Sequence, residues 1–193
     1  KYERSEHARG LLKLGLVAGS PSCSSCHGKH DIRPKSDAAA TTSHANIPDT
    51  CGKCHSGILR EWAESAHGVL WKTANGGKKT SEAPVCSTCH EPHAIKRTDT
   101  AVVRDQVADR CGNCHQEVDK SFHDSFHGKA SGLNNLKAAV CADCHTPHAN
   151  LPASDPRSSI HPDNLAKTCG ACHANVNPSF LSFDPHADPT DPK

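Results

Sequence analysis

The segment Cys86-Ser87-Thr88-Cys89-His90-Glu91-Pro92-His93 contains the pattern on which the rest of the chain is built. Its first five residues form the pattern Cys-x-x-Cys-His, which attaches a c-type haem. The two thiols can form thioethers with the two vinyl groups of the haem, and the histidine that follows can bind the iron from the proximal side. The second histidine, His93, cannot reach the opposite face of the same iron, so we expect it to bind a different haem.

The pattern occurs six times and accounts for all 12 cysteines of the chain. Zinc ribbons also use Cys-x-x-Cys pairs, but zinc does not require a histidine directly after the second cysteine. A disulfide framework also fits poorly, because it does not explain adjacent pairs with a fixed histidine. The sequence therefore predicts six covalently bound haem c groups with iron at their centres. The attaching cysteines are Cys23, Cys26, Cys51, Cys54, Cys86, Cys89, Cys111, Cys114, Cys141, Cys144, Cys169 and Cys172, and the proximal iron ligands are His27, His55, His90, His115, His145 and His173.

The composition agrees with a chain that depends on its cofactors for a core. Aromatic residues make up 4% of the 193 residues, Met is absent, and Gly and Pro number 13 each. Such a chain has too few large apolar side chains for a conventional core, and six porphyrins would supply the missing apolar surface. We therefore expect a mostly irregular backbone with short α-helices and almost no sheet, wrapped around a stacked haem chain. The formal net charge is +1 without a block of like charge, which argues against a nucleic-acid partner.

The motifs recur with a period of about 55 to 63 residues, and each period holds two of them. We expect a single domain over residues 1–193, built from three dihaem repeats at about 1–60, 61–120 and 121–193. Each repeat carries Ser-x-His before its odd-numbered motif, a histidine three residues after that motif, and a glycine after the first cysteine of its even-numbered motif. These landmarks are His7, His67 and His127; His30, His93 and His148; and Gly52, Gly112 and Gly170.

Helices are predicted after the even-numbered motifs, over His55 to Ala66 and His115 to Phe126. Trp62 and Phe122 each lie seven residues after the proximal histidine, and we expect both to pack on a haem. Helices of this length would rise roughly 18 Å, so the histidines at their two ends cannot share one iron.

Six irons with six proximal histidines need six distal ligands, and the repeat selects a consistent set. We expect the Ser-x-His histidines to serve the haems at Cys23, Cys86 and Cys141. We expect the histidines that follow the odd-numbered motifs to serve the haems at Cys51, Cys111 and Cys169. The predicted distal ligands are His7, His67, His127, His30, His93 and His148. His44 and His161 are rivals for a ligand role, and His123 is expected to be a solvated helix residue.

The segments Cys89-His90-Glu91-Pro92-His93 and Cys144-His145-Thr146-Pro147-His148, together with the Ser-x-His-Gly segments, resemble the multihaem c-type cytochromes with the doubled CxxCH motif. The resemblance covers essentially the whole chain, although His27-Gly28-Lys29-His30 departs from the His-x-Pro-His form. It implies closely stacked, low-spin haems with two histidine ligands each. Proteins of this family are electron carriers that occur in the periplasm, in conduits across outer membranes and in extracellular filaments.

Saturated iron favours electron transfer over catalysis, because an iron with two histidine ligands has no open position for a substrate. We therefore expect an electron carrier and not an enzyme; the alternative is a multihaem reductase of small nitrogen or sulfur oxyanions. The longest apolar run, near Leu11 to Ala18, is too short to be a transmembrane segment. We expect an extracytoplasmic location, which is periplasmic, cell-surface or extracellular, with redox partner proteins or extracellular acceptors.

His186 is a surplus histidine near the end of the chain. It lies 13 residues after His173, close to the 12 residues that separate His55 from His67, although there is no seventh motif for it to serve. One interpretation is a residue that faces solvent or bonds to a haem propionate. The other is a ligand for a haem of another copy, in a head-to-tail contact that would build a filament.

Overall fold

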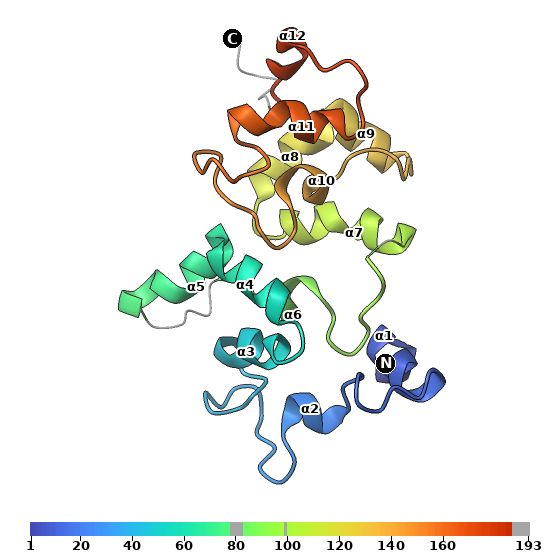
Figure 1. Ribbon diagram of the computed structural model, residues 1–193, viewed down its shortest axis with the longest axis vertical. Coiled ribbons are helices and arrows are strands. Elements are labelled where there is room, and N and C mark those ends of the chain that lie inside the picture. Colours follow the sequence, from blue (N-terminus) through green and yellow to red (C-terminus); the bar gives the residue numbers. More distant parts are fainter. Residues whose placement is uncertain (78–82, 99, 187–193) are drawn as a thin grey trace. The chain divides into compact units, whose positions relative to one another are not determined.

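Short helices joined by irregular backbone make up the protein in the computed structural model, which describes residues 1–77, 83–98 and 100–186. The described residues contain no β-strand, which confirms the predicted fold class. The chain divides into two compact units, Lys1–Arg97 and Thr98–Lys193 (Figure 1). The division into three dihaem repeats stays a prediction. No helix among the described residues is both long and apolar enough to cross a membrane.

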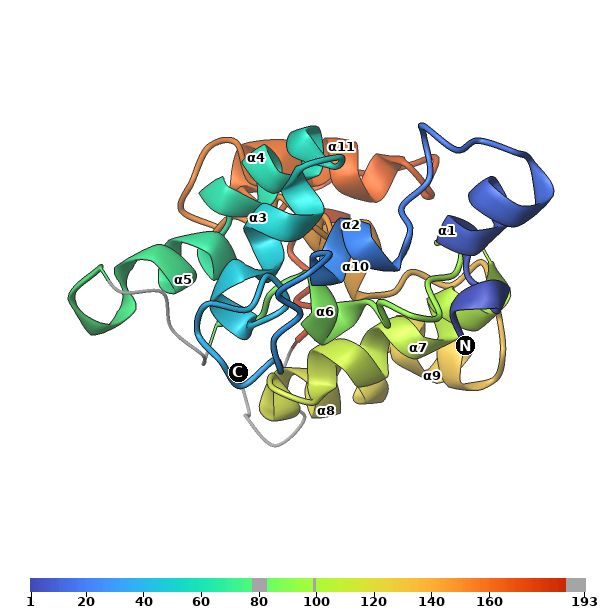
Figure 2. The same ribbon diagram turned by 90° about the horizontal axis from the view of Figure 1, so that it is seen from below.

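The first unit is built around α3, which packs against both α4 and α6, while α5 packs on α4 (Figures 1 and 2). Its core includes Trp62 and Trp71, whose rings meet edge to face with centroids 5.4 Å apart. The helices of this unit are η1 (Tyr2–Arg4), α1 (Glu6–Ala8), η2 (Arg9–Lys13), α2 (Cys23–His27), η3 (His44–Asn46), α3 (Ile47–Gly52), α4 (Ser56–Glu64), α5 (Ala66–Gly77) and α6 (Cys86–Cys89).

The second unit is centred on α8 and α10. Helix α8 packs against both α7 and α9, and α10 packs against both α7 and α11 (Figure 1). Phe122 on α8 is buried, at 6% exposed, in the place that Trp62 has on α4. The helices of this unit are α7 (Ala101–Gly112), α8 (Gln116–Asp124), α9 (Phe126–Gly132), α10 (Cys141–His145), η4 (Pro162–Asn164), α11 (Leu165–Gly170) and α12 (Pro178–Leu181).

Odd- and even-numbered motifs sit on helices in different ways. Each odd-numbered motif forms a short helix of its own, namely α2, α6 and α10, which starts at its first cysteine. Each even-numbered motif places its first cysteine in the last turn of α3, α7 or α11, and the glycine after it is the last helical residue. At Gly52 a Cβ would overlap the side chain of Leu59, and at Gly112 it would meet Asp119, so glycine makes room for the helix that follows.

The predicted helices over His55 to Ala66 and His115 to Phe126 are confirmed over most of their length as α4 and α8, but each ends earlier than predicted, because a serine interrupts it. Ser65 has extended backbone, with φ −68° and ψ 164°, and separates α4 from α5. Its Oγ donates to the carbonyl oxygen of Trp62 at 2.6 Å and accepts from the N–H of Gly68 at 3.2 Å. Ser125 caps α9 through the same bond from Gly128, at 3.2 Å. The serine of Ser-x-His is therefore an N-cap that ends one helix and starts the next.

The N-cap fixes where the histidine of this motif lies. Ser5 caps α1 by accepting from the N–H of Ala8 at 3.1 Å, as Ser65 and Ser125 do at their helices. His7 is consequently the second residue of a helix, and its backbone position is set by the cap. Ser-x-His therefore places its histidine in the first turn of a helix.

Replacing Gly68 with alanine should destabilise the first unit, because the new Cβ would overlap the carbonyl oxygen of Trp62, which is backbone and cannot turn away. Overpacking of this kind costs about 1–3 kcal/mol. Gly57→Ala is the matched control, since Gly57 lies on α4 and a Cβ there meets nothing within 4 Å. Thermal unfolding of the haem-loaded protein should show a lower Tm for Gly68→Ala and an unchanged or slightly higher one for Gly57→Ala. Equal Tm values for the two variants would contradict this account of the glycine.

Candidate haem sites

Free thiols are available at every motif, since all 12 cysteines lie within the described residues and none is in a disulfide. Motifs that follow one another in the chain lie next to one another within each unit. In the first unit Cys51 and Cys86 lie close enough for each thiol to shift the pKa of the other, and in the second unit Cys111 and Cys141 do the same. These contacts join the second motif to the third and the fourth to the fifth.

Two loops with the same hydrogen bonds tie the remaining neighbouring motifs together. In each, a hydroxyl residue between the two motifs donates to the carbonyl oxygen of the second cysteine in the odd-numbered motif. A threonine directly before the even-numbered motif then donates to the carbonyl oxygen of that hydroxyl residue. In the first unit Thr41 bonds to Cys26 at 2.5 Å, and Thr50 bonds to Thr41 at 2.7 Å. The corresponding bonds in the second unit join Ser159 to Cys144, and Thr168 to Ser159.

Among the described residues, four pairs of histidine rings lie at nearly the same separation. In each pair one ring belongs to a Cys-x-x-Cys-His motif and the other comes from elsewhere in the same unit. The ring centroids are 6.1 Å apart in His7–His55, 5.8 Å in His27–His93, 6.0 Å in His127–His173 and 6.1 Å in His145–His186. A different kind of ring contact, between His173 and Phe180, is closer, at 4.8 Å.

This separation fits two imidazoles on opposite faces of one iron. Metal–nitrogen bonds of about 2 Å would hold the centroids of two such rings roughly 6 Å apart. Ordinary aromatic pairs spread over about 4.5–7 Å, so direct packing gives no reason for the same value four times. Apolar surface is also available nearby, since Phe126, which precedes His127, is 80% exposed. The residues present therefore fit haem with two histidine ligands.

Burial favours the neutral imidazole that iron binding requires. The pKa of His7 is lowered by burial and further by the nearby His55. The pKa of His145 is lowered by burial and then by His186 and His115. A neutral ring keeps the nitrogen lone pair that a metal ion needs.

The pairs in the first unit differ from the predicted assignment. The sequence placed His7 with the haem at Cys23 and His30 with the haem at Cys51, whereas the structure sets His7 beside His55 and His93 beside His27. The N–H of Glu6 donates to the carbonyl oxygen of Ile95 at 2.9 Å, which holds α1 against the segment that follows His93. His30 is exposed.

The histidine pairs in the second unit also differ from the predicted assignment. His127 lies beside His173 and not beside His145, while His186 takes the place beside His145. In both units, then, a Ser-x-His histidine faces an even-numbered motif, and a histidine from later in the chain faces an odd-numbered one. The sequence argument for a filament rested on His186 having no haem in its own chain, and self-association stays a prediction. The ligand roles predicted for His67 and His148 stay predictions.

The other surplus histidines have contacts of their own. His44 Nε2 lies 2.9 Å from the carbonyl oxygen of Ala83, and His161 Nδ1 accepts from the N–H of Asp163 at 3.2 Å. His123 is exposed on α8, with its Nε2 3.6 Å from Asp119. The contact of His44 joins its segment to Ala83, which lies ahead of the third motif, and His161 caps η4. A ligand role for either stays a prediction.

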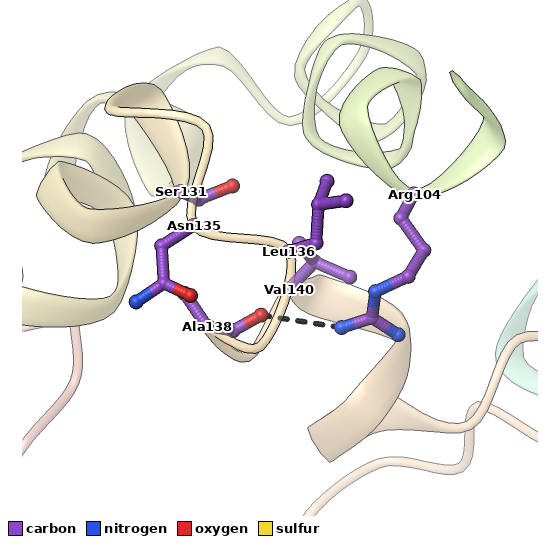
Figure 3. Close-up of a pocket in the computed structure, with 6 residues that line it drawn as sticks. All are labelled: Arg104, Ser131, Asn135, Leu136, Ala138 and Val140. Atoms are coloured by element: carbon purple, nitrogen blue, oxygen red, sulfur yellow. Dashed lines mark hydrogen bonds between the residues drawn. The ribbon is translucent and has the colours of Figure 1, made fainter. Parts of the chain in front are cut away.

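A small pocket beside the fifth motif shows how α7 holds α10 (Figure 3). Asp143 accepts from the N–H of Val140 at 2.8 Å, and Arg104 of α7 reaches both Asp143, at 2.9 Å, and the carbonyl oxygen of Ala138, at 3.2 Å. Asp143 thereby raises the pKa of Arg104. The pocket has a volume of about 10 Å³, room for roughly one water, so it serves packing and not substrate binding. Its lining residues are Arg104, Ser131, Asn135, Leu136, Ala138 and Val140.

Comparisons with known proteins agree with the site. The family model of the doubled CXXCH motif matches residues 78–120. The multihaem cytochrome MtrA of Shewanella baltica (strain OS185) is 25% identical over 191 residues, which cover 90% of this chain and 50% of the relative. The chain thus spans about half the length of this curated relative, and no solved structure matches it. With its six motifs and its paired histidines, the chain is similar to multihaem c-type cytochromes with doubled CxxCH motifs.

Proposed function

We propose that this chain transfers electrons through six covalently bound haem c groups, one at each Cys-x-x-Cys-His motif. The observation that carries the proposal is the set of four histidine pairs with centroids 5.8 to 6.1 Å apart. A bound haem supplies one-electron redox chemistry at its iron. Histidines on both faces leave that iron no position for a substrate, so the chain is a carrier and not an enzyme.

The order of the motifs within each unit supports passage of electrons along the chain. Thiols of successive motifs are in contact at Cys51 and Cys86 and at Cys111 and Cys141, and hydroxyl bonds join the motifs at Cys26 and Cys144 to the loops that lead into the next motif. Haems attached at such neighbouring points would supply successive redox centres along the chain. Each unit then acts as a short relay of consecutive haems.

The protein's own residues set the potentials of these haems. The chain contains no methionine, the ligand that raises the potential of other c-type haems, and each of the four histidine pairs would give an iron nitrogen ligands on both faces. Differences between haems then come from burial and from hydrogen bonds to the ligand histidines. His145 is half-buried, whereas His55 and His173 are exposed, which gives the haems unequal surroundings.

The location and partners follow from the same chemistry. Haem c is attached outside the cytoplasm, so we place the protein in the periplasm, on the cell surface or outside the cell. Its partners there are redox proteins or extracellular acceptors. Self-association into a filament stays a prediction of the sequence, and electron micrographs of the purified protein at high concentration would test it.

Haem counting and spin state together test the proposal. The intact mass and the pyridine haemochrome absorbance should both give six haems per chain, and the electron paramagnetic resonance (EPR) spectrum of the oxidised protein should show low-spin ferric iron only. A substantial high-spin ferric signal would support the reductase alternative, which needs an open iron position. Fewer than six haems in protein matured with excess haem would overturn the stoichiometry.

A further inference from the structure

We propose that His186 is the distal iron ligand at the Cys141–Cys144 motif and that Ser121 is the positioning residue that orients its ring. The inference rests on the proposed electron-transfer function, because it requires a haem at that motif. Its geometric basis is the pair formed with His145, in which the ring centroids are 6.1 Å apart. This value matches the other three pairs, and both rings are half-buried.

Hydrogen bonds fix which nitrogen of His186 is free. Ser121 Oγ donates to the carbonyl oxygen of Val118 at 2.9 Å, which uses the single hydroxyl proton. Ser121 Oγ also lies 3.2 Å from His186 Nδ1, so in this contact the hydroxyl oxygen is the acceptor and Nδ1–H is the donor. The neutral ring then has its lone pair on Nε2. A histidine that donates through one nitrogen and binds metal through the other is the usual arrangement at metal sites.

The backbone around His186 is held in place from both sides. Its N–H donates to Asp184 Oδ1 at 2.9 Å, which closes a turn directly before the histidine. Upstream, Asn177 caps α12 by accepting from the N–H of Phe180 at 3.0 Å, and the Phe180 ring packs on His173. The segment from Asn177 to His186 therefore places the Phe180 ring beside the sixth motif and the His186 ring beside the fifth.

His186 takes the place beside His145 that the sequence assigned to His127. His127, which the sequence assigned to this haem, lies beside His173, and His123 is exposed beside Asp119. The first unit shows the same division, since His27 of its first motif is paired with His93 from much later in the chain.

Variants of the haem-loaded protein test both parts of the inference. His186→Ala should convert one haem of six to the high-spin form in the oxidised protein, and added imidazole should restore the low-spin spectrum. His123→Ala is the matched control, since it removes an exposed histidine of the same unit, and it should leave all haems low-spin. Ser121→Ala should keep every haem low-spin but shift the EPR g-values and the midpoint potential of one haem, and Ser121→Thr should restore both.

The outcomes separate this inference from the proposed function. High-spin iron in the unchanged protein would overturn the proposed function itself. A fully low-spin unchanged protein together with a fully low-spin His186→Ala variant would overturn only the role of His186. If His186→Ala does not fold, His186→Met keeps a ligand and should raise the potential of one haem, and an unchanged set of potentials would overturn the assignment. A Ser121→Ala variant with unchanged g-values and potentials would remove the role of Ser121.

Discussion

A chain in which Cys86 and Cys89 are both replaced by alanine should fail to accumulate as soluble protein. The third haem would be unattached, and Cys86 packs against the core of the first unit, which contains Trp62 and Trp71. Net stabilities of folded domains are only about 5–15 kcal/mol, and folding is coupled to cofactor binding in small metal domains. Loss of this haem should therefore remove the fold of the unit and not only one redox centre.

The measurement is the yield of soluble, haem-containing protein relative to the unchanged chain from the same culture. Ser87→Ala is the matched control, because it alters the same motif and keeps both thiols, and its yield should equal that of the unchanged chain. Recovery of a stable five-haem form with a cooperative unfolding transition would show that the polypeptide has a core without this haem.

His93→Ala should turn one haem of six high-spin, while His30→Ala should leave all of them low-spin. The two histidines hold the same position in sequence, three residues after the proximal histidine of an odd-numbered motif. Only His93 has a motif histidine opposite it, His27 at 5.8 Å, whereas His30 is exposed. A difference between the two variants therefore comes from where each histidine lies in the structure, because their positions in the sequence motif are the same.

EPR of the oxidised variants checks this result, and redox titration should show one altered midpoint potential for His93→Ala and none for His30→Ala. Two variants with the same response would contradict the pairing. A high-spin haem in His30→Ala alone would instead support the assignment that the sequence predicted, in which His30 serves the haem at Cys51.

The motifs, and the absence of strands from the residues that the structure describes, could be predicted from the sequence because they depend on local pattern. The histidine pairs could not, because they depend on the path of the backbone between distant segments. The hydrogen bond from Glu6 to Ile95, which brings α1 to the segment after the third motif, has no sequence signature. The spacing from His173 singles out His186, but nothing in the sequence identifies His145 as its partner in the same chain.

Two further differences have local causes. Ser65 is a landmark of the repeat, and its residue type and its place before a histidine and a glycine also predict an N-cap. An N-cap at Ser65 gives the correct position of the helix break. Trp71 lies beside Val69 and Leu70, which are 47% and 43% exposed, so the sequence does not mark it as a core residue; its contact with Trp62 does.

An experimental structure of the haem-loaded protein tests the central claim most directly, through the identity of the two histidines on each iron. The account predicts that the two rings of each pair bind opposite faces of one iron. These pairs are His7 with His55, His27 with His93, His127 with His173, and His145 with His186. A structure in which His7 binds the iron at Cys23, or in which His186 binds no iron of its own chain, would contradict it.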